Sequence, residues 1–204
     1  MVAHQKPQRA SPQAYLERER AAERKSEYHD GVIVAMAGAS PEHNTIVFNL
    51  AGALSAQLRG KPCRGFSSDL RVRVPACNAY YYPDVTVVCG EPQYEMLAGL
   101  RSLLNPTLLI EVLSETTEKA DREGKFDCYW TLESLKTYVL VSQDRPRMEM
   151  FTRQADGSWR VEIANELASV IPLEAIGCAL RLADVYENIA FEETPQQDNS
   201  SPTG

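Results

Sequence analysis

The sequence predicts an α/β fold in which a mixed β-sheet is flanked by helices. Segments with helical and with extended patterns follow one another along the chain, as in folds that pack helices on a sheet. The apolar runs LLIEVL (108–113) and TYVLV (137–141) are typical of strands buried on both faces. The length of 204 residues, with 44% hydrophobic and 24% charged residues, suits one globular domain.

The chain begins with a predicted helix and a strand. Ser11-Pro12 resembles a helix start, with Ser11 as the N-cap, and the helix is expected to continue to about Lys25. Because this segment has few apolar residues, we expect it to lie at the surface. The triplet 29–31 (His-Asp-Gly) predicts a turn, and VIVAM (32–36) predicts a strand.

A second helix is predicted to lie in the core. It begins at Ser40-Pro41 and ends at Gly60, which Pro62 follows. Apolar residues recur every four positions along it, and they mark one buried face: Ile46, Leu50, Leu54 and Leu58.

The middle of the chain is predicted to be rich in strands. RGFSSDLRVRV (64–74) alternates in polarity, and YYYPDVTVVC (80–89) is a second extended run. We expect a loop from Glu91 to Asn105, then the buried strand 108–113. Residues Thr117 to about Leu132 are predicted to form a helix, which the strand 137–141 follows.

The chain is expected to close with a hairpin and a short helix. MEMFTR (148–153) and SWRVEIA (158–164) are joined by Asp156-Gly157, a sequence typical of hairpin turns. RLADVYENI (181–189) is short and amphipathic. We therefore predict one domain over residues 12–190, a flexible N-terminus (1–11) and a disordered tail (191–204).

Composition limits the classes of function. The net charge of −7 and the pI of about 5.1 are unlike a dedicated DNA-binding domain, which usually carries a basic excess. A bound divalent cation would offset part of this charge locally. No apolar run approaches the roughly 20 residues of a membrane span, so no membrane partner is expected.

The cysteines indicate a reducing environment. The five are an odd number, scattered, and form no C-x-x-C pair. This pattern argues against a disulfide framework and against a zinc cluster, and it favours the cytoplasm.

Two carboxylates occur where hydrophobic burial disfavours them. Glu111 lies inside LLIEVL, and Asp84 begins the apolar run after Pro83. Burial of an unpartnered carboxylate costs several kcal/mol, so such acids need a partner. Two acids on adjacent strands would hold a hard cation such as Mg²⁺. The alternative is that Asp84 is an ordinary strand-end residue and Glu111 is a buried acid paired with an arginine.

An ordered set of segments resembles the Uma2 family, a branch of the PD-(D/E)XK nuclease superfamily. The segments cover roughly residues 12–190 and are YLERE, KSEYHDGVIVAMAGAS, the H-N of His43-Asn44, SSDLRVRV, YYYPDVTVV, LLIEVLSETTEKADREGKFDCYW and LKTYVLVSQD. The resemblance implies a restriction-endonuclease-like core, with helices on both faces of a mixed sheet. It also implies a metal-dependent phosphodiesterase centre.

The resemblance assigns the catalytic residues. Asp84 matches the first acid of the motif and Glu111 the second, and the backbone carbonyl of Val112 would complete a site for Mg²⁺ or Mn²⁺. The motif's lysine would fall at Leu113 and is absent. Lys125, on the following helix, matches the family's substitute; its alternative role is that of a solvated helix lysine.

Three further residues match supporting positions. Asp121 lies four residues before Lys125, on the same face of the predicted helix, and would hold the lysine side chain in place. Glu27 matches an early acid of the family and is otherwise a surface glutamate. His43 matches a histidine at the start of the core helix, where capping of the helix is the alternative role.

The resemblance implies an endonuclease that hydrolyses phosphodiester bonds in DNA, and the superfamily suggests a homodimer or higher homo-oligomer. Two alternatives remain open. One is an inactive nuclease fold that binds DNA or a protein. The other is a structural protein whose buried acids pair with Arg71 or Arg73.

Overall fold

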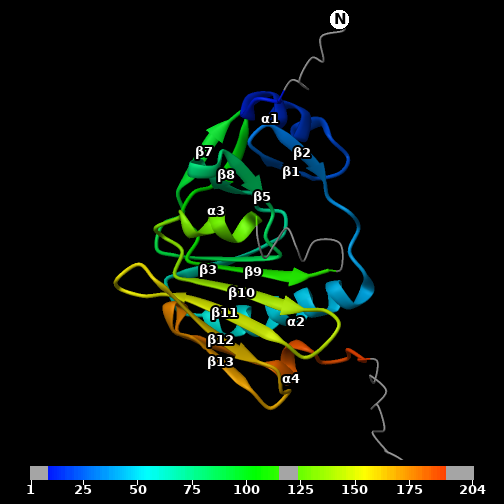
Figure 1. The fold of residues 1–204 in the computed structure, drawn as a ribbon, viewed down its shortest axis with the longest axis vertical. Helices are drawn as coiled ribbons and strands as arrows, with labels where there is room; N and C mark the ends of the chain where they lie inside the picture. The colour runs from blue at the N-terminus through cyan, green and yellow to red at the C-terminus, as the bar shows by residue number, and fades with distance from the viewer. Residues whose placement is uncertain (1–8, 115–123, 192–204) are drawn as a thin grey trace, which may run out of the picture.

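A computed structural model describes residues 9–114 and 124–191 (Figure 1). The predicted flexible N-terminus and disordered tail lie almost entirely outside these ranges. The described chain forms two six-stranded sheets and a separate two-stranded hairpin. The predicted fold class, a mixed sheet flanked by helices, is confirmed.

The central sheet carries the strands that the sequence predicts as buried. Its strands β9 and β10 are parallel, and its other neighbours are antiparallel. The order is β12 (Trp159–Ala164), β11 (Met148–Arg153), β10 (Thr137–Ser142), β9 (Leu108–Leu113), β6 (Val85–Cys89) and β3 (Cys63–Ser67).

The second sheet lies beside α1, away from α2 (Figure 1). Its order is β2 (Val32–Ala35), β1 (Ser26–His29), β5 (Ala79–Tyr81), β4 (Val72–Val74), β8 (Leu100–Leu103) and β7 (Tyr94–Leu97), with the 3-10 helix η1 (Pro75–Cys77) between β4 and β5. The predicted loop 91–105 is wrong, because it contains the β7–β8 hairpin. Ala98 and Gly99 turn this hairpin with positive φ values of 52° and 76°.

Both extended runs of the middle region are divided between the two sheets. The run 64–74 becomes β3 and β4, with a turn between them. The run 80–89 becomes β5 and β6, and Pro83 lies at the break. A proline has no amide hydrogen for a sheet ladder, so the chain can leave one sheet there and enter the other.

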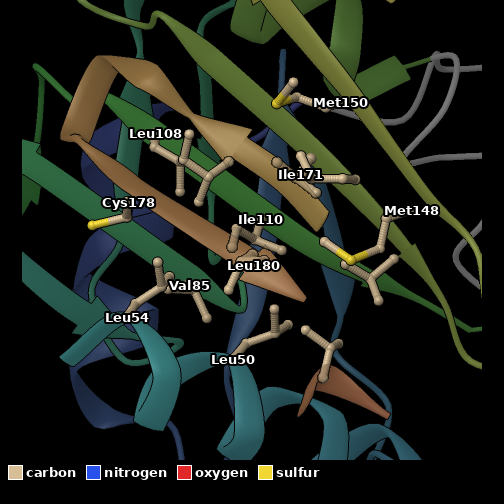
Figure 2. Packing of buried hydrophobic residues seen from close by; sticks show 14 of the residues in the cluster. Leu50, Leu54, Val85, Leu108, Ile110, Met148, Met150, Ile171, Cys178 and Leu180 are labelled. Carbon is tan, nitrogen blue, oxygen red and sulfur yellow. The ribbon is translucent and has the colours of Figure 1, made fainter. Parts of the chain in front are cut away.

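Helix α2 (Pro41–Leu58) covers one face of the central sheet, as predicted. Ile46, Leu50, Leu54 and Leu58 are all buried, and they pack with Val85, Ile110 and other sheet residues (Figure 2). The hairpin β13 (Val170–Leu173) and β14 (Cys178–Arg181), the 3-10 helix η3 (Glu174–Ile176) and α4 (Leu182–Val185) complete this layer.

Of the two shorter helices, α3 packs on the other side of the central sheet, and α1 packs against the second sheet. Helix α3 (Phe126–Trp130) packs Tyr129 against the face that carries Leu109 and Leu113. Of the predicted helix 117–132, residues 117–123 lie outside the described chain. Helix α1 (Pro12–Ala21) begins at the predicted cap but ends before Lys25, because Ala22 is extended and β1 follows.

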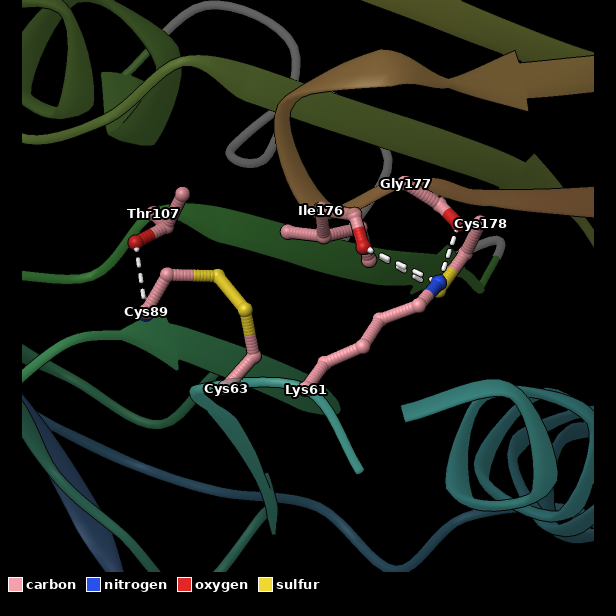
Figure 3. Close-up of a disulfide and its surroundings, with 7 residues drawn as sticks. All are labelled: Lys61, Cys63, Cys89, Thr107, Ile176, Gly177 and Cys178. Atoms are coloured by element: carbon pink, nitrogen blue, oxygen red, sulfur yellow. Dashed lines mark hydrogen bonds between the residues drawn. A yellow bond between two sulfur atoms is a disulfide. The ribbon is translucent and has the colours of Figure 1, made fainter. Parts of the chain in front are cut away.

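Two disulfides contradict the prediction from the cysteine pattern. Cys63–Cys89 joins partners in the β3–β6 register (Figure 3), and Cys77–Cys128 joins η1 to α3. The prediction is wrong because the pairs are 26 and 51 residues apart, and only the fold brings them together. The expectation of a reducing cytoplasm loses this support, since disulfides persist mainly in oxidising compartments.

Within residues 9–114 and 124–191, no helix has the length and apolarity to cross a membrane.

We expect Leu50→Ala to lower the free energy of unfolding by about 2–5 kcal/mol, because it opens a cavity between α2 and the central sheet. The matched control is Leu167→Ala, since Leu167 is 45% exposed and its truncation should change stability by only about 0.5 kcal/mol. Urea denaturation of both variants under non-reducing conditions measures the difference. Equal losses would contradict the buried position of Leu50.

Candidate active site

Asp84 immediately precedes β6, at the point where the chain enters the central sheet. The last pair of the β6–β9 ladder is Val85 with Ile110. Two residues further along β9, the amide of Val112 donates to Oδ2 of Asp84 at 2.7 Å. The carboxylate thus accepts the hydrogen bond that a carbonyl of a neighbouring strand would otherwise accept. In a strand, the amide and carbonyl of one residue leave on the same side, so the Val112 carbonyl is directed to the same edge.

Glu111, which precedes Val112 on the same strand, is a buried acid whose partners include Tyr129 and Lys125. Its side chain is 4% exposed and lies on the face that Leu109 and Leu113 share. Tyr129 donates its hydroxyl to Oε1 at 3.0 Å, and the Lys125 Nζ is 3.6 Å from the same oxygen. These partners reduce the cost of a buried carboxylate.

Lys125 bridges the two sheets. At the N-cap of α3, it places its Nζ 2.9 Å from Oε1 of Glu27, in addition to its contact with Glu111. Glu27 comes from β1 and also accepts from the amide of Tyr82 at 3.1 Å. The ammonium also lies over the ring of Tyr81, 5.6 Å from its centroid. Lys125 is therefore not the solvated helix lysine of the alternative reading.

His43 approaches Asp84 from the opposite layer. It lies in the first turn of α2, and its Nε2 is 3.3 Å from Oδ2 of Asp84. Its amide donates to the capping hydroxyl of Ser40 at 3.0 Å. The residue thus takes part in the capped turn and also contacts the acid. Because His43 lies in the first turn of α2, the positive N-terminal end of the helix dipole is also near the Asp84 carboxylate.

The structure therefore brings together all but one of the residues that the sequence singles out. One series of contacts runs from His43 to Asp84 and on to the Val112 amide. A second series links Glu27, Lys125 and Glu111. The two series meet in β9, where Glu111 and Val112 are adjacent. Asp121 lies outside the described residues.

Tyr129 is a member of the site that the sequence analysis missed. It lies four residues after Lys125, on the same helix face, and that spacing was the available signal. Burial, and then the charge of Glu111, hold the pKa of Tyr129 well above its ordinary value. The hydroxyl therefore stays protonated and remains a donor to Glu111.

The proposed pairing of the buried acids with Arg71 or Arg73 is not what the geometry shows. Arg71 donates to the hydroxyls of Tyr82 and Ser102, and Arg73 lies 3.4 Å from Glu95. The ion partner that contacts Glu111 is Lys125.

The groups that the family resemblance assigns to a metal ion are all oxygen donors. Over residues 9–114 and 124–191, no group of three or more His, Cys, Asp and Glu side chains is arranged to hold a metal ion. The carboxylates of Asp84 and Glu111 and the carbonyl of Val112 remain. One or two carboxylates, completed by water, are a common way to hold Mg²⁺.

Comparisons with known proteins agree with this architecture. Two uncharacterized proteins of Synechocystis sp. are similar: one is 35% identical over 76% of this chain and 88% of its own length, and the other is 32% identical over 94% and 100%. The crystal structure of a protein from Anabaena variabilis, titled "a putative nuclease belonging to DUF820", matches with a TM-score of 0.64. The match covers 81% of this chain and 91% of that one at 18% identity, and it supports the fold.

The model of the Uma2 family, described as "Putative restriction endonuclease", matches residues 12–183. The chain belongs to the Uma2 family.

Proposed function

We propose that this protein is an endonuclease that uses Mg²⁺ or Mn²⁺ to hydrolyse phosphodiester bonds in DNA. The observation that carries the proposal is the position of Lys125, which contacts both Glu27 and Glu111. Glu111 is next in sequence to Val112, whose amide donates to Asp84, so the lysine lies near that acid too. A cation and carboxylates gathered in one place are the groups that phosphodiester hydrolysis needs. The family description adds support.

The residues fit a divalent cation in donor type and in charge. Asp84, Glu111 and the Val112 carbonyl are hard oxygen donors, as Mg²⁺ and Mn²⁺ prefer. Three carboxylates, those of Glu27, Asp84 and Glu111, gather here around the single ammonium of Lys125, and a divalent cation would offset the excess of negative groups.

The contacts already made by Glu111 are compatible with this role. Tyr129 and Lys125 both approach Oε1. A carboxylate accepts about four contacts on its two oxygens, so a cation can share it with these donors. When bound, the ion would lower the pKa of a water molecule and stabilise negative charge on the phosphate.

The protein's own groups would position the reactants. The Lys125 ammonium would orient the attacking water and place positive charge beside the phosphate oxygens. Glu27 would hold that ammonium in place, and Tyr129 would fix the orientation of Glu111. His43 would hold the Asp84 carboxylate against the Val112 amide.

One observation favours a second function, that of a nuclease fold which binds DNA without cutting it. Leu113 occupies the position of the superfamily's lysine and is buried in the hydrophobic cluster beneath α3. The net charge of −7 also opposes tight binding of phosphates. DNA binding without metal-dependent cleavage would distinguish this function from the enzyme.

We expect Asp84→Ala and Lys125→Ala each to lower cleavage of supercoiled plasmid by about 10²-fold or more, because the first removes a ligand of the metal ion and the second removes positive charge beside the reacting phosphate. Cleavage by the wild type should require Mn²⁺ or Mg²⁺. Asp69→Ala and Lys136→Ala are matched controls, since both residues are exposed and lie outside the site. Undiminished metal-dependent cutting by Asp84→Ala would refute the assignment of the site.

We expect Tyr129→Phe to weaken Mn²⁺ affinity by about 10–100-fold, because Glu111 loses the donor that orients it while the ring packing is kept. Calorimetric titration of Mn²⁺ measures this change, and circular dichroism checks that the variant is folded. Tyr94→Phe is the matched control, since Tyr94 lies on β7 in the second sheet. An unchanged affinity in Tyr129→Phe would show that Glu111 does not hold the ion.

A further inference from the structure

We propose that two copies of this chain form a symmetric dimer through the outer side of α2, with Phe48 of each copy inserted into a cavity beside the same helix of the other. Two independent features point to this arrangement. One is an aromatic side chain that projects from the helix. The other is a cavity two turns further along the same helix, large enough to accept a phenyl ring.

Phe48 is the projecting side chain. It is 78% exposed, whereas the inward residues Ile46, Leu50 and Leu54 are at most 2% exposed. The residues around it on the outer side are small and exposed, and they allow another backbone to approach: Ala51, Gly52, Ser55 and Ala56. Such an aromatic residue, set among small ones, is typical of an interface anchor.

The hole is a cavity of about 390 Å³ between α2 and the edge strand β3. It exists because small residues, Gly65 and Ser67 of β3, face the helix where larger side chains would fill the space. Ala51 and Ser55 of α2 and Val87 of β6 also line it. Since benzene enters an apolar cavity of about 150 Å³ in another protein, a phenyl ring has ample room here.

Helix geometry makes these two features self-complementary. Phe48 and Ser55 are seven residues apart, so they lie on nearly the same side of α2, about 10 Å apart. A two-fold axis near Ala51 and Gly52 would pair the helices antiparallel. Phe48 would then meet Ser55 of the partner subunit, and the reciprocal contact would form at the other end of the interface.

The charges on α2 permit this self-association despite the net charge of −7. From residue 43 to residue 58 the sequence has no Asp, Glu, Lys or Arg. Glu42 lies at one end of the helix and Arg59 at the other. Antiparallel packing brings the acidic end of each helix near the basic end of its partner, so opposite charges approach.

Two single variants and their mixture test the dimer. Sedimentation equilibrium of the full chain, without DNA or metal, should show a dimer for the wild type. Phe48→Asp should raise the dimer Kd by about 30-fold or more, as expected for loss of a central anchor. Ser55→Lys should also weaken the homodimer, because it blocks the cavity. Mixed in equal amounts, the two variants should form a heterodimer, since one contact becomes an Asp–Lys pair and the other keeps the native Phe–Ser contact.

Val161→Asp is the matched control, because Val161 is 50% exposed on β12 and lies outside α2. It should leave the dimer intact. A monomeric wild type, or a dimer that Phe48→Asp does not weaken, would overturn the proposal. A mixture that stays as monomeric as its components would also overturn it. Each variant changes an exposed residue, and thermal unfolding verifies that each is folded.

Discussion

The structure of the site depends on the Lys125 ammonium lying between two carboxylates. Glu27 reaches it from the second sheet and Glu111 from the central sheet, so this interaction joins the two halves of the fold at one point. Burial of charged groups costs several kcal/mol for each ion, and their mutual attraction offsets this cost only when the geometry is good. The positions of β1, β9 and α3 are therefore coupled: a shift of one element would leave a buried charge without its partner.

The parts of the fold that could be predicted are those with a local pattern. The period of four in Ile46, Leu50, Leu54 and Leu58 predicted the buried face of α2, and the continuous apolar run predicted β9. The β7–β8 hairpin was missed because its turn, Ala98-Gly99, lacks the Asn-Gly or Asp-Gly sequence that marks such turns most strongly. The disulfides were missed because strand register, and not spacing along the chain, brings the cysteines together.

The same distinction holds for the site. Asp84 and Glu111 were recognisable because ionisable residues in apolar runs are unexpected, and Lys125 was assigned through the family resemblance. The contact between Lys125 and Glu27 joins residues almost 100 positions apart, and no pattern within the sequence encodes it. Tyr129 was not singled out, because an aromatic residue in a predicted helix gives no signal beyond that of ordinary core packing. The single domain over 12–190 stays a prediction, as do the catalytic roles.

The division of residues 80–89 between two sheets has a consequence for folding. Because the chain leaves one sheet at Tyr81 and enters the other at Val85, Asp84 lies on the short link that joins the two sheets. The contacts of the site span the chain from Glu27 to Tyr129, and contacts of such high sequence separation form late and slowly. A partly folded chain would therefore hold its acids apart, and the candidate site would assemble late in folding.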